Sequence, residues 1–272
     1  MVRGMRDKRY AYIKNYMPWA PNGQHLSYMW ALPATKAWEK HYLEGKCDDI
    51  TGRFFRPRVS EEFYDTETDF HNIHNLIDAP DHQEKINELR KALRAKQLEL
   101  FDSGLLPEAM RLRRAEAHNL TIYQMVRNPE LYPLEKYLDY ADLVLARDPA
   151  QLPVFVEGLK DPDEGIRYWA ICGLFLLENH ARSAQQEIEA ALEDEADEVK
   201  LMAAWALHRL GNTEMADACL ERLRQERSKL EKPDLKDNHF FESLRRWMSL
   251  KKPLDKSGAS NATQEEAEVS IH

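Results

Sequence analysis

The chain has 272 residues, of which 43% are hydrophobic and 31% are charged, and its formal net charge is -9 at pH 7. This composition predicts a globular protein that can build one large core or two small domains. The acidic balance argues against a nucleic-acid partner, and no apolar run approaches the length of about 18 to 20 residues that a membrane span requires. The basic start of the chain is not followed by an apolar segment, so the chain shows no secretory signal and its compartment stays open.

The first 17 residues alternate aromatic and charged side chains, most regularly over Lys8–Tyr16. A period of two predicts a β-strand. Because a lone strand or hairpin is only marginally stable in water, we expect this strand to belong to a sheet. An irregular loop punctuated by prolines follows, and helical signals come after it at Thr35–Tyr42.

The stretch Glu61–Leu76, with the sequence EEFYDTETDFHNIHNL, predicts a short strand and then a polar turn, and the chain beyond it is helical. A helix is expected to open at Asp78, which can cap it, and Gly104 is expected to end it. The apolar residues of this helix recur at helical spacing and predict one buried face. They are Ile86, Leu89, Leu93 and Leu100.

An internal repeat with an offset of 33 residues aligns Leu159–Leu174 (LKDPDEGIRYWAICGL) with Leu192–Leu207 (LEDEADEVKLMAAWAL). Each copy has a turn Asp, a β-branched residue, a basic residue and a small residue in the same order, which is typical of HEAT-like repeats. The basic residue can reach the carboxylate or the carbonyls of the preceding turn. About three such units are usually needed for stability, so helices at 134–147 and 213–228 are expected to flank the pair.

Several side chains that could form a functional site are expected to have only a structural role. The three cysteines are far apart and form no disulfide or metal-binding spacing, and Cys172 and Cys219 are expected in the core. The basic run Arg111–Arg114 is expected to be a solvated helix face. The larger aromatic residues are expected in the core or at its caps, namely Tyr168, Trp169, Trp205 and Trp247.

Two stretches resemble the C-terminal subdomain of sulfatases. The pattern R-D-x-R-Y-x-Y-I-x-N is matched at Arg6, Asp7, Arg9, Tyr10, Tyr12, Ile13 and Asn15. The pattern E-L-Y-D-x-x-x-D-P-x-E-x-x-N-L is matched at Glu62, Tyr64, Asp65, Asp69, Asn75 and Leu76, whereas Phe63, Phe70 and Asn72 depart from it. The loop at 23–28 is similar to the heparan N-sulfatase-like group.

The resemblance and the repeat together imply an α+β fold that is mostly helical. Residues 1–133 are expected to form the small antiparallel sheet of a sulfatase C-terminal subdomain, which is part of an alkaline-phosphatase-like domain. Residues 134–250 are expected to form a HEAT-like helical array, and 251–272 a disordered tail with no apolar periodicity.

The family's chemistry can be searched for directly. Sulfatases carry a formylglycine made within a C/S-x-P-S/A-R motif, and they use a calcium ion held by Asp and Asn. Neither Cys47, Cys172, Cys219 nor any Ser is followed by that motif. The resemblance therefore implies the C-terminal portion of a sulfate-ester hydrolase that has no nucleophile or metal ligands here, binds no cofactor, and is expected to be inactive alone.

Two other sets of residues were weighed as metal sites. Asp69, His71 and His74 could ligate zinc if they formed one helical face, but a turn is the better interpretation of this stretch. The acidic pair Asp48–Asp49 is expected to be a solvated turn.

The residues favoured for substrate binding are Lys14, Gln24 and His25, and only within a full-length enzyme. A cation and hydrogen-bond donors suit an anionic sulfated sugar, and the family's C-terminal subdomain can line the rim of the substrate site. The alternative is that Lys14 is an exposed strand residue and His25 an ordinary loop histidine. At the level of function, the alternative is a helical-repeat module that binds another protein, whereas the first interpretation makes the missing N-terminal sulfatase portion the partner.

Overall fold

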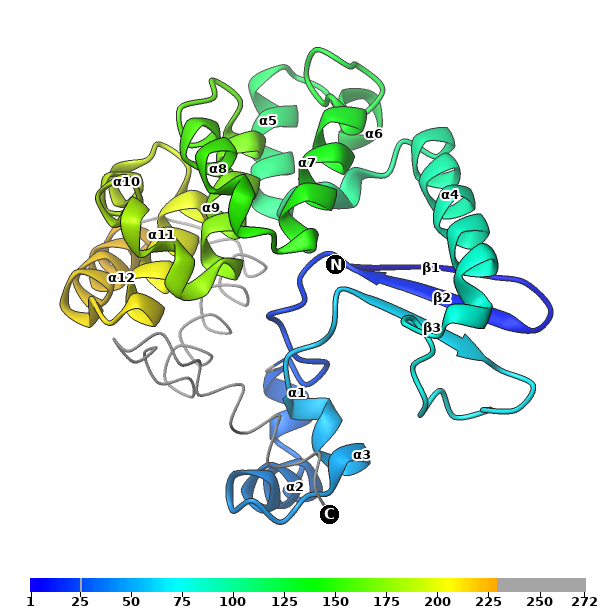
Figure 1. Cartoon of the computed structure of the whole chain (residues 1–272). Helices are drawn as coiled ribbons and strands as arrows, with labels where there is room; N and C mark the ends of the chain where they lie inside the picture. The colour runs from blue at the N-terminus through cyan, green and yellow to red at the C-terminus, as the bar shows by residue number, and fades with distance from the viewer. Residues whose placement is uncertain (25, 229–272) are drawn as a thin grey trace. The chain divides into compact units, whose positions relative to one another are not determined.

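The computed structural model describes residues 1–24 and 26–228 (Figure 1). The chain forms two compact units. The first contains Met1–Leu105 and Ile122–Leu134, and the second contains Leu106–Thr121 and the chain from Glu135 onward. The predicted class, α+β and mostly helical with a small antiparallel sheet and a HEAT-like array, is confirmed. The predicted division at residue 133 and the predicted tail stay predictions, and the tail lies outside the described residues.

The first unit is built on a three-stranded antiparallel sheet with the order β1 (Val2–Arg6), β2 (Tyr10–Asn15) and β3 (Glu61–Asp65). The strand predicted over Lys8–Tyr16 is confirmed as β2, and β1, which was not predicted as a separate strand, pairs with it in a hairpin. The chain turns between the two strands. The reason is Asp7, whose carboxylate accepts the backbone N–H groups of Arg9 at 2.8 Å and Tyr10 at 2.7 Å and so turns the chain.

One face of the sheet is covered by α4 (Gln83–Glu99), which follows the short 3₁₀ turn η2 (Pro80–His82). Tyr12 lies opposite Met5 on β1 and Phe63 on β3, so these side chains share a face. The predicted apolar face of the helix supplies the other half of this core through Ile86, Leu89 and Leu93, which are all buried.

The end of α4 differs from the prediction. The helix ends at Glu99, and Phe101, which follows the C-cap residue Leu100, has a left-handed φ of +54°. Gly104 lies beyond it in η3 (Ser103–Leu105). The amide of Asp102 donates to the carbonyl of Gln97 at 2.9 Å, which closes the helix in the way that a C-terminal glycine usually does. Leu100 therefore lies past the last turn and is 62% exposed instead of buried.

Four shorter helices complete the first unit. They are α1 (Ser27–Trp30), α2 (Pro33–Leu43), α3 (Asp49–Gly52) with the 3₁₀ turn η1 (Arg53–Phe55), and α6 (Ile122–Met125). Helix α2 matches the predicted helical signal and has no buried residue. Its Trp38 ring stacks on Phe54 with 4.7 Å between ring centroids.

The second unit consists of helices. The helices before the repeat are α5 (Glu108–Ala117) and α7 (Leu134–Ala146). The first residue of α7, Leu134, belongs to the first unit. Two helix pairs follow and correspond to the predicted repeats: α8 (Leu152–Gly158) with α9 (Glu164–Leu176), and α10 (Gln185–Ala190) with α11 (Asp197–Leu210). The last described helix is α12 (Thr213–Ser228), and the 3₁₀ turns are η4 (Pro149–Gln151), η5 (Glu178–Ala184) and η6 (Ala191–Glu193).

The repeat helices α9 and α11 are the centre of the second unit and contact each other directly. Their large aromatic residues are buried as predicted, and so are Cys172 and Cys219, whereas Trp247 lies outside the described residues. Gly173 shows how closely α8 and α9 approach, because a Cβ there would come within 2.8 Å of the Phe155 ring. The buried aromatic residues are Tyr168, Trp169 and Trp205.

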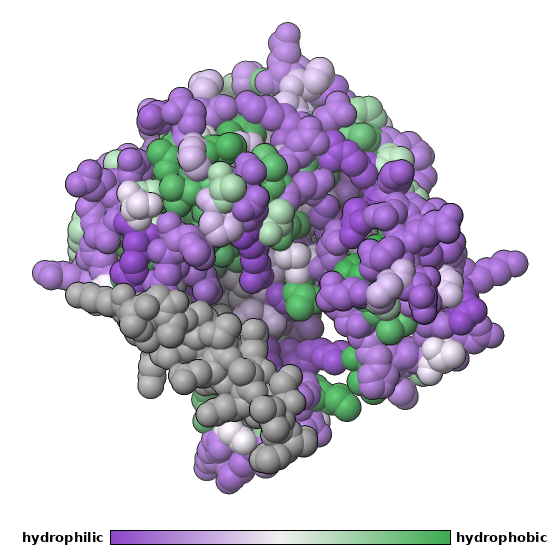
Figure 2. Space-filling view, in the orientation of Figure 1, coloured by the Kyte–Doolittle hydropathy of each residue, from purple (hydrophilic) through white to green (hydrophobic). Residues whose placement is uncertain are grey.

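No helix in the described part of the chain is long and apolar enough to cross a membrane. Most of the surface seen in Figure 2 is hydrophilic, with hydrophobic residues in separate patches. Single apolar residues on a surface are normal, so only a cluster with additional features carries information.

Candidate functional site

Lys14, the first residue favoured for substrate binding, is not the exposed strand residue that one alternative assumed. It lies on β2 and is only 8% exposed, with Arg3 opposite on β1 and Glu61 opposite on β3. Its Nζ lies 5.4 Å from the centroid of the Tyr16 ring. A lysine at this position contributes its charge from within the sheet and not from solvent.

Glu61 is the carboxylate of this group. It accepts hydrogen bonds from Arg90 of α4, at 3.0 and 2.6 Å, and from the Tyr12 hydroxyl. Burial raises the pKa of Glu61, but the bonds from Arg90 and Tyr12 outweigh burial, so the pKa lies below its usual range. Glu61 therefore stays ionised beside Lys14, and its charge links the sheet to the covering helix.

Of the other two residues favoured for substrate binding, Gln24 and His25, the structure describes only Gln24. Gln24 is exposed, in a loop that is fixed by the backbone bond from Gly23 to the carbonyl of Phe54 at 2.7 Å. A Cβ at Gly23 would come within 2.7 Å of the Phe54 ring, so the close approach requires glycine. His25 lies outside the described residues. The structure thus places Lys14 within the sheet and Gln24 at the surface.

Arg58 and Asn15 are polar residues beside Lys14 that the sequence analysis did not single out as a site. Arg58 donates to the carbonyls of Ala20 at 2.9 Å and Met17 at 3.2 Å, and so it holds the start of the loop. Burial lowers the pKa of Arg58, and the charge of Glu62 opposes that effect. Asn15 donates to Glu62 at 2.6 Å.

The residues weighed as a zinc site form a turn. Asp69 accepts the backbone N–H of His74 at 2.7 Å. Backbone hydrogen bonds from Ile73 and His74 lower the pKa of Asp69. The acidic pair Asp48–Asp49 caps α3, with Asp48 accepting the backbone N–H of Thr51.

No group of three or more His, Cys, Asp and Glu side chains that could hold a metal ion occurs within residues 1–24 and 26–228.

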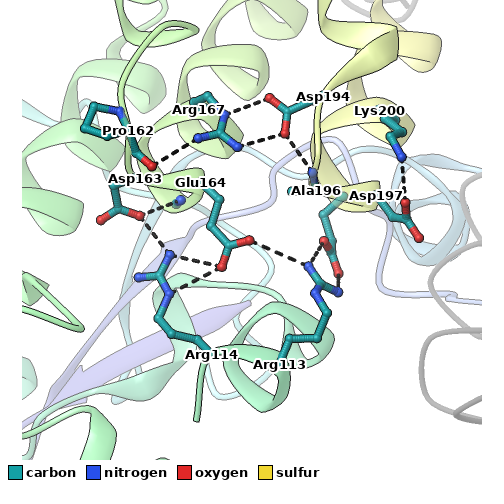
Figure 3. A network of polar contacts seen from close by, with 12 residues as sticks. Arg113, Arg114, Pro162, Asp163, Glu164, Arg167, Asp194, Ala196, Asp197 and Lys200 are labelled. Atoms are coloured by element: carbon teal, nitrogen blue, oxygen red, sulfur yellow. Dashed lines mark hydrogen bonds and ion pairs between the residues drawn. The ribbon is translucent and has the colours of Figure 1, made fainter. Parts of the chain in front are cut away.

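The second unit contains a different kind of polar site, a ladder of ion pairs between successive repeats (Figure 3). Arg167 of α9 donates to the carbonyls of Asp161 at 3.0 Å and Pro162 at 3.2 Å, as predicted for the basic residue of the repeat. It also donates to the carboxylate of Asp194 at 2.7 and 3.0 Å, in the turn of the following repeat. Asp194 in turn accepts the backbone N–H of Ala196 at 2.8 Å. The arginine therefore joins two turns and fixes their spacing.

The basic run on α5 corrects one prediction in part, because Arg114 is paired and largely buried, whereas Arg113 is paired but 45% exposed. Arg113 forms two bonds with Glu198, at 2.9 and 2.6 Å, and Glu198 is only 4% exposed. Arg114 is 12% exposed and donates to Asp163 at 2.8 Å and to the Tyr137 hydroxyl at 2.6 Å. The two arginines attach α5 to both repeat helices of the second unit (Figure 3).

The pKa of Arg114 shows how firmly it is paired. Burial lowers that pKa, but the charge of Asp163 and the Tyr137 hydroxyl outweigh burial, and the net shift is upward. Arg114 is thus a permanent cation surrounded by its acceptors, and it is not available as an acid or base. The ladder and its α5 extension are structural, and they define the rigidity of the helical array.

Comparison with known proteins gives two matches. The family model for HEAT repeats matches residues 152–232. An ulvan-active sulfatase from Formosa agariphila is 32% identical over 110 residues, which are 40% of this chain and 18% of that protein. The matched part thus spans less than a fifth of the relative's length. No solved structure matches the chain. The chain is distantly sulfatase-like and HEAT-like.

Proposed function

We propose that the first unit belongs to a sulfatase-type hydrolase that acts on sulfated polysaccharide, as its C-terminal subdomain, and that the second unit is a HEAT-repeat module attached to it. The observation that carries this proposal is the pairing of the two stretches that resemble sulfatases. They are more than 45 residues apart in the sequence, and they lie side by side as β2 and β3.

The polar residues of the two patterns also bond to each other. Arg9 donates to Asp65 at 2.6 Å, and Asn15 donates to Glu62 at 2.6 Å. Asn75 accepts the backbone N–H of Phe63 at 2.8 Å and so protects the outer edge of β3. These bonds join the two patterns within one sheet. The match at these positions, together with the 32% identity to a sulfatase, therefore supports a shared subdomain over a chance similarity.

Within such an enzyme, this chain would supply the rim of the substrate site and not the reacting groups. Lys14 would act through its charge from within the sheet, Gln24 would contact the sugar from the exposed loop, and His25 would follow it in the same loop. The chain lacks the C/S-x-P-S/A-R motif, so we expect no turnover of sulfate esters by residues 1–272 alone.

The rim role can be tested in the polypeptide that also contains the formylglycine motif. Gln24→Ala and His25→Ala should each raise KM for a sulfated oligosaccharide severalfold, because each removes a hydrogen-bond donor to an anionic sugar. Lys8→Ala is the matched control, since Lys8 is exposed at the turn between β1 and β2. Wild-type kinetics for both variants would exclude the rim role.

A second function, binding of a protein partner by the helical array, is favoured by the HEAT-repeat match at 152–232. Stacked repeats commonly present extended surfaces to other proteins. The DNA upstream of the first codon distinguishes the two. A C/S-x-P-S/A-R motif in the same reading frame supports the hydrolase, and an unrelated gene there supports a separate interaction protein.

A further inference from the structure

An exposed aromatic–arginine cluster lies in the first unit, where the end of α4 meets α6. It consists of Phe101, Tyr123 and Arg127, and we call it the Arg127 cluster. The guanidinium carbon of Arg127 lies 3.5 Å from the centroid of the Tyr123 ring and 4.6 Å from that of Phe101. Tyr123 is 66% exposed and Phe101 is 39% exposed. Two rings and a cation are thus held together at the surface, where burial does not explain them.

Phe101 occupies a position that is unfavourable for its residue type. Its φ of +54° is left-handed, and a bulky side chain rarely adopts that conformation. The same bonds that close α4 would form with glycine, which fits a left-handed helix end without strain. The phenylalanine ring at this position contacts the guanidinium of Arg127.

Arg127 differs in its partners from the arginines that fasten the sheet to its surroundings. Arg3, Arg9 and Arg90 each pair with a carboxylate of the same unit. Arg127 donates through Nη1 to the carbonyl of Tyr123 at 2.9 Å, and no carboxylate pairs with it within residues 1–24 and 26–228. Its Nε and Nη2 donors remain for an external acceptor, and the two rings restrict the plane in which that acceptor can bind.

We propose that the Arg127 cluster binds a sulfated saccharide. The sulfate oxygens would accept from the guanidinium edge, and the apolar face of the sugar ring would lie against the exposed aromatic surface. This ligand rests on the proposed function, which makes sulfated polysaccharide the substrate class. The site would hold the polymer at a second point on the same subdomain and so raise the local concentration of substrate.

The test is calorimetric titration of the 272-residue chain with sulfated oligosaccharides cut from ulvan, and with the same fragments after chemical desulfation. We expect Arg127→Gln to weaken binding of the sulfated fragments about tenfold, because it removes a charge-assisted contact. Tyr123→Ala should weaken it severalfold. Arg6→Gln is the control, since Arg6 is another exposed arginine of the same unit, and it should bind like the wild type.

Phe101→Gly separates binding from folding. It removes the strained side chain, so its thermal midpoint should be no lower than that of the wild type, while its affinity for the sulfated fragments should fall. Three outcomes overturn the proposal: no binding by the wild type, equal binding of sulfated and desulfated fragments, or wild-type affinity for Arg127→Gln. Equal affinity for an acidic peptide of the same charge would also overturn it, in favour of a protein partner.

The binding experiment requires no turnover, so its result is independent of the search for a formylglycine motif. Sulfate-dependent binding without any upstream motif would leave a glycan-binding module and refute the hydrolase. An upstream motif without such binding would leave the hydrolase and refute the Arg127 cluster as a site.

Discussion

Within each of the two units, polar contacts join residues that are different distances apart in the sequence. In the first unit, Arg9 pairs with Asp65 across 56 positions and Arg3 with Asp102 across 99. In the helical array, Lys136 reaches Asp161 across 25 positions and Arg167 reaches Asp194 across 27. The ladder of the array thus joins neighbouring repeats, whereas the sheet depends on distant segments. Helix α5 is the exception in the array, because Arg113 reaches Glu198 across 85 positions.

This difference explains where loops and exposed side chains gather. The array hides most of α9 and α11, and its arginines are used in the ladder. The first unit has exposed aromatic residues on several elements, among them Tyr28, Phe70 and Tyr123. Both binding sites that we propose lie in the first unit, whereas the second unit is built from stacked helices.

The largest expected effect comes from the core of the first unit. Phe63→Ala should lower the free energy of unfolding by about 3 to 5 kcal/mol, because the ring is fully buried between the sheet and α4. Phe70→Ala is the matched control, since Phe70 is 84% exposed and its removal should change stability little. Chemical denaturation measures both, and equal losses would show that the sheet core is placed incorrectly.

The next effect concerns the attachment of α5 to the array. Arg114→Leu should cost about 3 kcal/mol of stability, because it leaves the carboxylates of Asp163 and Glu164 without their cation in a partly buried site. Arg224→Leu breaks an exposed pair with Glu221 and should cost less than about 1 kcal/mol. If both variants lost the same amount in urea unfolding, the α5 contacts would be ordinary surface pairs.

A smaller effect is expected from the ladder itself. A double-mutant cycle with Arg167→Ala and Asp194→Ala should give a coupling energy of about 1 to 2 kcal/mol, since the two side chains share two hydrogen bonds and are largely buried. Thermal unfolding of the four proteins measures it. Strict additivity would mean that the ladder does not couple the repeats.

The smallest effect is a dependence on pH in the first unit. The guanidinium of Arg9 lowers the pKa of Asp65 to about 2, below its value of about 4 in the unfolded chain. The stabilisation is therefore complete above about pH 4 and is lost as the pH falls toward about 2. Asp65→Asn should reduce the fall in thermal midpoint between pH 5 and pH 2.5, whereas Asp81→Asn, at an exposed position, should not. An unchanged fall for Asp65→Asn would contradict the pair.

The elements that could be predicted from the sequence are those with a regular spacing of residues. The 33-residue offset located α9 and α11, and the spacing of Ile86, Leu89 and Leu93 located the buried face of α4. The prediction failed where one side chain overrides a pattern. The turn at Asp7 separates an unpredicted strand, β1, from the predicted one, and the left-handed Phe101 closes the end of α4 before Gly104 is reached.

The candidate sites were less predictable, for a physical reason. The burial of Lys14 depends on a strand contributed by a distant segment. The strand pattern around Lys14 alone therefore does not determine whether its side chain is exposed. The Arg127 cluster brings residue 101 next to residues 123 and 127, and neither segment carries a motif that announces the contact. The sequence alone shows only that an aromatic residue, Tyr123, lies four positions before Arg127.

The most direct test of the central claim, that the first unit is part of a sulfatase-type hydrolase, is sulfate release from ulvan. We expect none from residues 1–272 alone, and release by the polypeptide that continues upstream through a formylglycine motif, with loss of activity when that motif is mutated. Sulfate release by the 272-residue chain alone, or an upstream frame without the motif, would contradict the claim.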